Sequence, residues 1–392
     1  MRWKFPPKND QSYNAERQDV CRRIDQWWRA FEAKHESLGR VFSGKETWDL
    51  PQWMNDNLGA VHRELMWEYG PGLEGGHRLV ITPETSRSLR PMVDTLLAQA
   101  PTIPGWEFYP YRLRETVDEA HRMLEARKLM PLKQVTVIVT PNSLNQVDLL
   151  FISPNFSDND DSDASNAAFV ASEVILGEEI LDHWIGFVDV DNDAGHAEMS
   201  VELPDLAAAV DRELATIRET LPKNPWWQSL ENTDWHLFDI KSSISNNRFN
   251  RSDMFVASSA SLNMWQSTVS DAIFCSERYS MTGEIFCFVR IDGNKRASDE
   301  RLRERREFED SLDRALKIAQ AGAVVGNAFG ETYSYIDLAL SNADIGTEIT
   351  IDTLRSDGIA QNAWIQFYDD IYAHEWIGLW DDTPPPPRRL TS

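Results

Sequence analysis

The residues whose types and spacing best suit chemistry lie near the C-terminus, where Asp369-Asp370 is followed closely by His374-Glu375. Carboxylates and an imidazole just past a strand can bind a divalent ion. A bound ion can activate water, so Asp369, Asp370 and His374 support one hypothesis, a metal-dependent hydrolase. Such clusters on an acidic protein are more often surface charge, and the sequence therefore favours a non-enzymatic protein with no catalytic residue and no bound metal.

The other reaction motifs of the sequence do not fit their required context. The string Gly70-Pro71-Gly72-Leu73-Glu74-Gly75 matches G-x-G-x-x-G, but a dinucleotide site needs a strand before it and a helix after it. Here a predicted helix precedes and a predicted strand follows, and Pro71 has no amide to donate. The eight histidines form no HExxH motif and no His/Cys zinc spacing, and no Walker A loop or GxSxG elbow occurs. The sequence therefore predicts no cofactor.

A second candidate site is one face of a predicted C-terminal sheet. Because strand side chains alternate between faces, one face carries aliphatic residues that suit covering helices. The opposite face, here named the aromatic face, carries the candidate binding residues Phe286, Phe288, Arg290, Tyr333, Tyr335, Asp337, Trp364 and Tyr368. RNA-recognition domains stack bases on such a face, but a net charge of −24 repels phosphate backbones. The sequence predicts that this face packs against the N-terminal domain or another chain, and marks it as the expected binding surface.

The elements that position this face follow the order strand, helix, strand, strand, helix, strand. This order is that of a split βαβ, or ferredoxin-like, unit. Aromatic and β-branched residues predict the first strand, over 284–291. Ser298, followed by acidic residues, predicts the start of the first helix, because acids are favoured in the first turn. The remaining strands are predicted at 323–325, 333–340 and 363–369, with a second helix through Ile345, Ile349 and Leu354.

The preceding residues also mix helices and strands. The region from about residue 9 to residue 69 has a helical pattern of apolar residues, ended by glycines and Pro71. A hairpin is predicted from 135–139 and 147–152 across a Pro-Asn-Ser turn. The other elements expected before residue 222 are strands at 79–81, 106–111 and 184–190 and helices at 85–100, 116–129 and 206–221. A further helix is expected through Phe169, Val170, Val174 and Ile175, leading to Gly177.

The expected fold class is α+β, with two α/β sandwich-type domains. The expected divisions are an N-terminal helical segment (1–70), an α+β domain (71–221), a linker region (222–253), a ferredoxin-like domain (254–381) and a disordered Pro-rich tail (382–392). The linker is placed where proline, serine and asparagine are frequent, and the tail where four prolines precede two arginines. A chain of 392 residues is long enough for this number of domains.

Composition limits the location and the partners of the chain. Three cysteines without CxxC spacing make a disulfide framework improbable and suit a reducing compartment. No apolar run approaches the roughly 18 residues of a membrane span. We therefore expect a cytoplasmic protein that binds neither nucleic acid nor membrane. The acidic charge favours a protein partner, a basic one most readily, or self-association.

Several short strings resemble those of uncharacterised bacterial proteins of the domain-of-unknown-function 695 class. They include Leu79-Val80-Ile81-Thr82, the segment from Ile103 to Phe108, and Leu176-Gly177-Glu178. Tyr333-Ser334-Tyr335-Ile336-Asp337 and Trp376-Ile377-Gly378 resemble a domain of related hypothetical proteins. The resemblance implies no known reaction; some such proteins are similar to, or fused with, regulators that inhibit nucleases by contact. Together with the charge, it favours an interaction or regulatory protein that acts through protein–protein contact.

Overall fold

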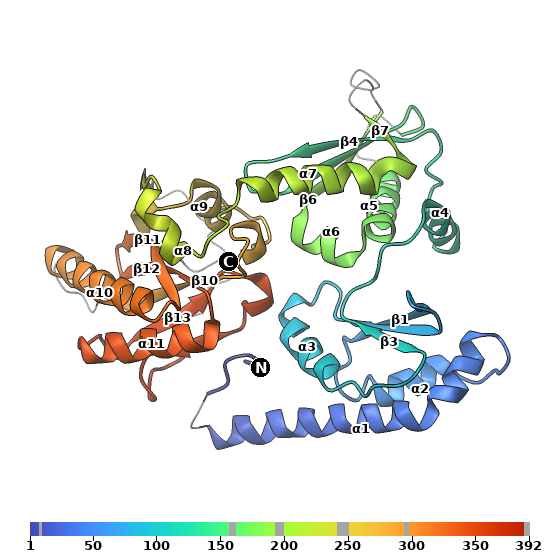
Figure 1. Cartoon of the computed structure of the whole chain (residues 1–392), viewed down its shortest axis with the longest axis horizontal. Helices are drawn as coiled ribbons and strands as arrows, with labels where there is room; N and C mark the ends of the chain where they lie inside the picture. The colour runs from blue at the N-terminus through green and yellow to red at the C-terminus, as the bar shows by residue number, and fades with distance from the viewer. Residues whose placement is uncertain (8–9, 157–161, 193–199, 241–250, 294–297, 388–392) are drawn as a thin grey trace. The chain divides into compact units, whose positions relative to one another are not determined.

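The computed structural model describes residues 1–392 except 8–9, 157–161, 193–199, 241–250, 294–297 and 388–392 (Figure 1). The protein is α+β and divides into two compact units. Unit 1 comprises residues 1–113 and 371–375, and unit 2 comprises residues 114–370 and 376–392. None of the described helices combines the length and the apolar character that crossing a membrane requires.

Unit 1 packs helices against a small sheet. Its order is α1 (Gln11–Phe42), α2 (Leu50–Asn57), β1 (Met66–Pro71), β2 (His77–Thr82), α3 (Arg90–Ala98) and β3 (Trp106–Tyr109). β2 is the central strand, antiparallel to β1 and parallel to β3. The long helix α1 buries an aromatic stripe that includes Trp27, Trp28 and Phe31, and the indole N–H of Trp28 donates to Leu96 O of α3 at 2.8 Å. Burial of this stripe fixes α1 to the unit.

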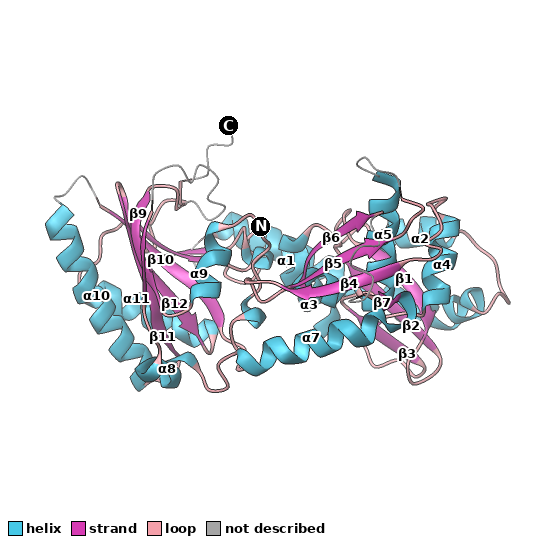
Figure 2. Cartoon of the chain, turned by 90° about the horizontal axis from the view of Figure 1, so that it is seen from above, coloured by secondary structure: helices cyan, strands magenta, loops and turns pink. Residues whose placement is uncertain are grey.

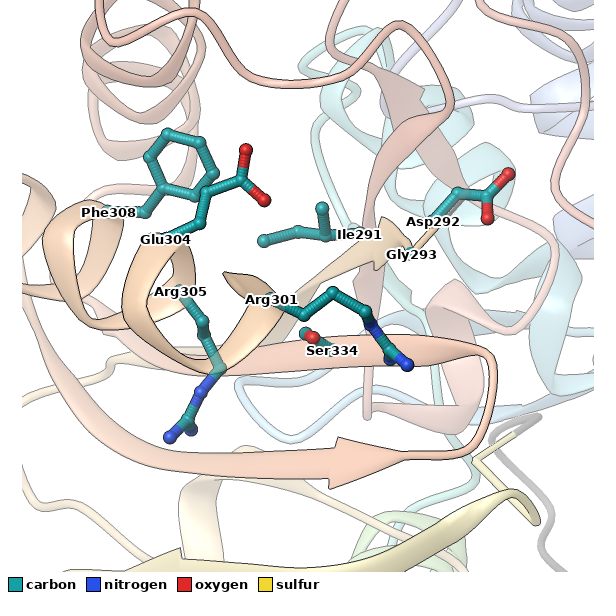
Figure 3. Close-up of a pocket in the computed structure, with 8 residues that line it drawn as sticks. All are labelled: Ile291, Asp292, Gly293, Arg301, Glu304, Arg305, Phe308 and Ser334. Carbon is teal, nitrogen blue, oxygen red and sulfur yellow. The ribbon is translucent and has the colours of Figure 1, made fainter. Parts of the chain in front are cut away.

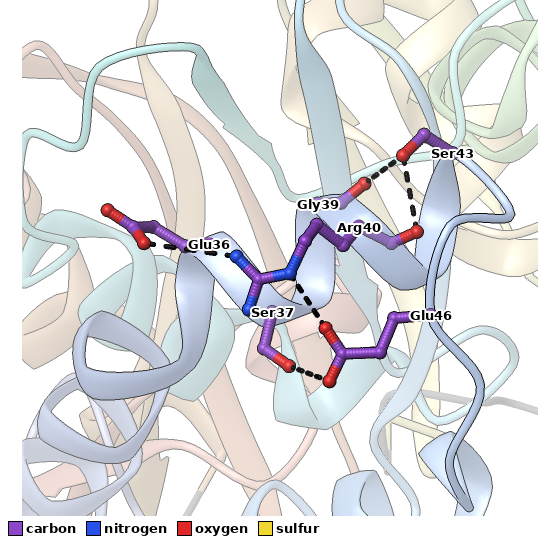
Figure 4. Close-up of polar contacts among 6 residues, drawn as sticks. All are labelled: Glu36, Ser37, Gly39, Arg40, Ser43 and Glu46. Atoms are coloured by element: carbon purple, nitrogen blue, oxygen red, sulfur yellow. Dashed lines mark hydrogen bonds and ion pairs between the residues drawn. The ribbon is translucent and has the colours of Figure 1, made fainter.

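The two ends of α1 are capped by polar side chains. At the start, Asp10 accepts a hydrogen bond from the Tyr13 N–H at 3.0 Å. At the end, the Ser43 hydroxyl donates to Gly39 O, and Gly44 takes a left-handed φ of 69° that turns the chain (Figure 4). Figure 4 also shows Arg40 bound to Glu46, with 2.8 Å between Nε and Oε2. Both side chains are solvent-exposed, so this pair orients the turn and adds little stability.

The first part of unit 2 is a four-stranded sheet with helices on it. Its elements are α4 (Val117–Ala126), β4 (Thr136–Pro141), β5 (Val147–Ile152), α5 (Ser162–Leu176), α6 (Glu178–Trp184), β6 (Ile185–Asp191), β7 (Val201–Glu202) and α7 (Leu206–Thr220). The strand order is β6-β5-β4-β7. β4 and β5 form the predicted antiparallel hairpin, with Thr136 opposite Ile152. The alternating apolar residues of this hairpin form a core with α5 and α7.

The second part of unit 2 is a seven-stranded sheet. Its elements are α8 (Trp226–Ser229), β8 (His236–Asp239), β9 (Met254–Ser259), α9 (Leu262–Val269), β10 (Ile285–Asp292), α10 (Ser298–Ile318), β11 (Gly322–Gly330), β12 (Tyr333–Leu340), α11 (Ala343–Ser356), β13 (Ala363–Phe367) and β14 (Trp376–Gly378). The strand order is β14-β13-β10-β12-β11-β9-β8, and all neighbours are antiparallel. Figure 2 shows α10 and α11 together on one side of this sheet.

The predicted alternation of the central strands is confirmed by their register. Cys287 lies opposite Leu338 and Phe367, whereas Phe288 lies opposite Asp337 and Gln366. Residues opposite each other in a sheet project from the same side. The aliphatic residues therefore share the side of α10, where Phe308, Leu312 and Leu316 of the helix are buried, and the aromatic residues share the other side.

Several boundaries differ from the sequence prediction. Residues 66–71, placed at the end of a helical segment, form β1, because β2 offers a backbone ladder to this stretch. The first division falls after residue 113 rather than at 70, since α1 and α2 share one core with β2 and α3. The segment 222–253, expected as a linker, contributes α8 and β8 to unit 2; its residues 241–250 lie outside the described residues.

The start of the Pro-rich tail is also packed rather than free. Thr383 is buried and its hydroxyl donates to Gln361 O at 3.0 Å. Pro384 O accepts a hydrogen bond from the Trp364 indole N–H at 2.6 Å. These contacts hold the residues that follow β14 against β13, and only 388–392 of the predicted tail lie outside the described residues.

Candidate functional site

The aromatic face is covered within unit 2. Its side chains share one buried core with residues that precede β10 in the chain, namely Trp226, Leu230, Ile240, Met254, Ala257, Ala260, Met264, Trp265, Phe274 and Tyr279. The indole of Trp226 packs edge-on to Phe286, with 6.2 Å between ring centroids. Its N–H donates to Tyr279 O at 3.1 Å. The segment expected as a linker thus supplies much of the cover.

A buried ion pair lies in the middle of this core. Arg251 Nη1 is 3.0 Å from Asp337 Oδ1, and each side chain is only 1% exposed. The guanidinium carbon is 4.9 Å from the ring centroid of Tyr335 and 5.2 Å from that of Phe288. The Tyr368 hydroxyl donates to Asp337 Oδ1 at 2.9 Å. Burial raises the pKa of Asp337, and Arg251 offsets part of that effect. The aromatic rings and the opposite charge together keep the cation in the core.

The other polar members of the aromatic face are also engaged. The Tyr335 hydroxyl donates to Asp253 Oδ1 at 2.5 Å, and burial raises the pKa of Tyr335 well above its usual value. Asp253 Oδ2 accepts the backbone N–H of Tyr333 at 2.9 Å. The Arg290 guanidinium lies over the Tyr333 ring at 3.7 Å. The Tyr335 hydroxyl and the Asp253 carboxylate bind one another, Arg290 stacks on Tyr333, and these groups leave no open recognition surface here among the described residues.

The structure corrects the expectation that this face is open to a partner or to the N-terminal domain. Tyr333 is half-buried, and the other predicted binding residues are buried: Phe286, Phe288, Arg290, Tyr335, Asp337, Trp364 and Tyr368. The cause is local in sequence, since residues 226–240 and 251–279 fold back over the face. Alternation identified which residues share the face, but it carries no information about what covers it.

Two carboxylates of the predicted hydrolase segment, Asp369 and Glu375, accept hydrogen bonds from other parts of the chain. Both oxygens of Asp369 bind Ser276: Oδ1 accepts the backbone N–H at 2.7 Å and Oδ2 accepts the hydroxyl. Burial raises the pKa of Asp369 to about 6. Glu375 belongs to unit 1, where its carboxylate accepts the Lys4 and Phe5 N–H groups, each at 2.9 Å. Asp370 is buried and His374 is exposed. The carboxylates of Asp369 and Glu375 are thus structural acceptors for backbone and hydroxyl groups.

A hollow beside the start of α10 is filled largely by an arginine. It holds about 180 Å³ of space, open solvent included, and is lined by Ile291, Asp292, Gly293, Arg301, Glu304, Arg305, Phe308 and Ser334 (Figure 3). Arg301 donates to Glu331 O at 2.9 Å and to Gly330 O at 3.0 Å. Its guanidinium also lies 4.5 Å from the Phe329 ring centroid. Because Arg301 closes the β11–β12 turn, we assign this hollow a structural role.

Several large apolar side chains are exposed at the β8 edge of the seven-stranded sheet, unlike those of the packed core. β8 is the outermost strand on that side among the described residues. Leu237 of β8 is 79% exposed, Trp235 just before it is 48% exposed, and Phe255 of β9 is 42% exposed. We name these three residues the edge patch. Acidic side chains are interspersed with them, since Asp234 and Asp239 are exposed as well.

The register explains why the edge patch is exposed. Phe238 lies opposite Ala257, Ala257 lies opposite Ala328, and Ala328 lies opposite Tyr335. Phe238 is therefore on the same face of the sheet as Tyr335 and projects into the aromatic core. It stacks on Trp265, with 4.7 Å between ring centroids. By alternation, Leu237 projects from the side that carries α10 and α11. Those helices contact the central strands, so their cover ends before the edge.

Phe255 is brought to the same side by an irregularity in β9. Phe329 lies opposite Val256 but Gly330 lies opposite Met254, so Phe255 is an extra residue in β9, a β-bulge. Its ring contacts Phe329 edge-on at 5.4 Å and remains partly exposed. Bulges often occur near sheet edges and re-aim side chains, as this one does.

Sequence reasoning missed the edge patch because it placed residues 234–239 in a linker. The sequence carries little signal here: Leu237 and Phe238 are adjacent apolar residues that do not alternate with polar ones. The alternation of half-buried and exposed positions at 236–239 is visible only in the structure. A run this short does not outweigh the flanking proline, serine and asparagine as evidence. Its strand state depends on β9 as a pairing partner.

Comparison with known proteins adds no assignment, because no family model, no curated protein and no solved structure matches this chain.

Proposed function

We propose that the protein is a non-enzymatic interaction or regulatory protein that binds another protein at the β8 edge of its seven-stranded sheet. The observation that carries this proposal is the exposure of three large apolar residues, Trp235, Leu237 and Phe255, at a strand edge. An exposed edge strand has unpaired backbone groups to which a strand of another protein can add. Clusters of exposed apolar side chains are typical of protein interaction sites.

The chemistry of the edge defines the partner. A partner strand that pairs with β8 would place every second side chain on the face of Leu237. Its remaining side chains would lie on the opposite face of the sheet. Asp234 and Asp239 are exposed next to the apolar residues, and the chain carries a net charge of −24. We infer an extended segment of a partner protein in which apolar residues alternate with lysine or arginine, because opposite charges steer association and fix register.

We also propose that β10, α10, β11, β12, α11 and β13 form a ferredoxin-like unit within the larger sheet. The antiparallel order β13-β10-β12-β11 supports this, as does the position of α10 and α11 on one side. The resemblance to the domain-of-unknown-function 695 class remains a prediction. It would agree with a regulator that acts by contact.

The test is affinity capture from native lysate with the full chain and matched variants. We expect wild type to retain a stoichiometric protein that Leu237→Lys and Phe255→Lys both lose, since a charge added to the apolar contact opposes burial. Ile318→Lys is the control, because Ile318 is as exposed as Leu237 and lies at the end of α10. It should retain the partner.

A second measurement reports the mode of binding. Hydrogen exchange of the 236–239 amides should slow when the captured partner is added, because strand addition bonds the free edge. Capture that is equal for wild type and all three variants would refute the β8 site. Turnover on a substrate panel by a chain that retains no partner would refute the interaction function itself.

A further inference from the structure

Outside the edge patch, three metal-ligating side chains converge in unit 2. Among the described residues, His183, Cys275 and Glu277 form the one such group, and their ligand atoms all lie within 4.8 Å of one another. His183 stands in the last turn of α6, whereas Cys275 and Glu277 flank Ser276 at the start of the 3₁₀ turn Ser276–Arg278. The sequence offered no signal, since almost a hundred residues separate the histidine from the other two.

The spacing of these ligand atoms is compatible with a small divalent ion. His183 Nδ1 lies 3.3 Å from Glu277 Oε2. An ion about 2.0–2.3 Å from nitrogen, oxygen and sulfur ligands holds those ligands roughly 3–4 Å apart. An ion pair between imidazole and carboxylate would explain two of the side chains. It does not explain why the thiol of Cys275, a free and buried cysteine, lies beside them.

The turn that carries two of the ligands is rigidly held. Asp369 binds both the backbone N–H and the hydroxyl of Ser276, the residue between Cys275 and Glu277. The Ser276 hydroxyl oxygen also accepts the Phe286 N–H at 3.0 Å, which ties the turn to β10. The Arg278 N–H donates to Cys275 O at 3.2 Å. Ligands fixed by such surrounding hydrogen bonds bind metals more tightly than mobile ones.

The turn is also tied to the segment that carries His183. Asn145, in the turn between β4 and β5, donates to Arg278 O at 2.7 Å and accepts from Asn263 Nδ2 at 2.8 Å. The Tyr279 hydroxyl donates to Leu144 O at 3.3 Å. Gln146 in turn donates to Ile185 O, two residues after His183, at 3.3 Å. These hydrogen bonds and the short stretches of chain between them therefore link the position of the histidine to that of the thiol.

We propose that His183, Cys275 and Glu277 bind a zinc-type divalent cation. One imidazole nitrogen, one thiolate sulfur and one carboxylate oxygen make a donor set that suits Zn²⁺ and is unsuited to Mg²⁺ or Ca²⁺, which prefer oxygen ligands. Three protein ligands leave a fourth tetrahedral position for water or for a side chain from another molecule.

The test titrates the full apo chain with Zn²⁺ and with Co²⁺ as a spectroscopic probe. We expect one equivalent of Zn²⁺ to bind, and Co²⁺ to give the intense near-ultraviolet band of a cobalt–thiolate bond. Cys275→Ser should abolish this band, and both Cys275→Ser and His183→Asn should weaken Zn²⁺ binding at least 100-fold. Cys21→Ser and His374→Asn are the matched controls, since Cys21 is only partly buried and His374 is exposed. Both should bind as wild type does.

Asp369→Asn tests the positioning residue. It should lower Zn²⁺ affinity about 10-fold and preserve the cobalt–thiolate band, because supporting hydrogen bonds contribute 10- to 100-fold to metal affinity. Circular dichroism of each variant shows that it is folded. The proposal is refuted if folded wild type gives no thiolate band with Co²⁺, or if Zn²⁺ affinity is unchanged in both Cys275→Ser and His183→Asn.

Discussion

Large apolar side chains are buried at the centre of the seven-stranded sheet and exposed at its β8 edge. At the centre, Tyr335 and Tyr368 are fully buried, and the guanidinium of the Arg251–Asp337 ion pair lies near both rings. At the edge, Leu237 is 79% exposed within the same sheet. The difference shows that aromatic content alone does not identify a binding surface. Residues 226–240 and 251–279 cover the centre and make it part of the core, whereas α10 and α11 stop short of the edge.

The largest effect is expected from Arg251→Met, which removes the cation but keeps an apolar side chain of similar length. Asp337 would be left buried without its charge partner, a loss that costs about 3–5 kcal/mol. Urea unfolding of the full chain measures it. The double variant Arg251→Met, Asp337→Leu should recover at least half of the loss. A single-variant cost below about 1 kcal/mol would show that the centre is not a closed core.

An intermediate, pH-dependent effect is expected at Glu309, on the α10 side of the centre. Burial raises its pKa to about 7, and Arg305, whose Nη1 lies 2.8 Å from Glu309 Oε1, offsets part of this shift. Between the unfolded pKa near 4.5 and about 7, the folded protein keeps a proton that the unfolded chain has lost. Stability therefore falls as pH rises through this window, by up to about 3 kcal/mol.

Glu309→Gln removes this dependence and provides the test. The variant should be more stable than wild type at pH 8 and similar to it at pH 4, as measured by urea unfolding across this range. Glu307→Gln, an exposed position on the same helix, is the control and should leave the wild-type profile unchanged. Parallel profiles for wild type and Glu309→Gln would contradict the assignment.

The smallest effect on stability is expected from Leu237→Lys at the edge. Because Leu237 is mostly in solvent, the free energy of unfolding should change by less than about 0.5 kcal/mol. The same urea experiment measures it, with Ile318→Lys as the comparison. Partner capture should nevertheless be lost. A cost above about 1 kcal/mol would mean that Leu237 packs against the protein itself, and the contrast between centre and edge would disappear.

The sequence by itself determined much of the local structure of the central strands. Alternation placed Phe288 and Asp337 on one face and Cys287 and Leu338 on the other, and the register confirms both pairs. The hairpin of β4 and β5 and the helices α7 and α10 were likewise predictable. These features depend on residue propensities and on apolar periodicity within single segments, and both can be read directly from the sequence.

Only the tertiary structure decided what those segments contact. It placed residues 226–240 and 251–279 over the aromatic face, bound Asp369 to Ser276, left Leu237 in solvent, and brought His183 beside Cys275. Each outcome joins residues distant in sequence, and no local pattern encodes such a pairing. The physical reason is that burial and ion pairing depend on long-range packing, whereas helix and strand periodicity depends on neighbours along the chain.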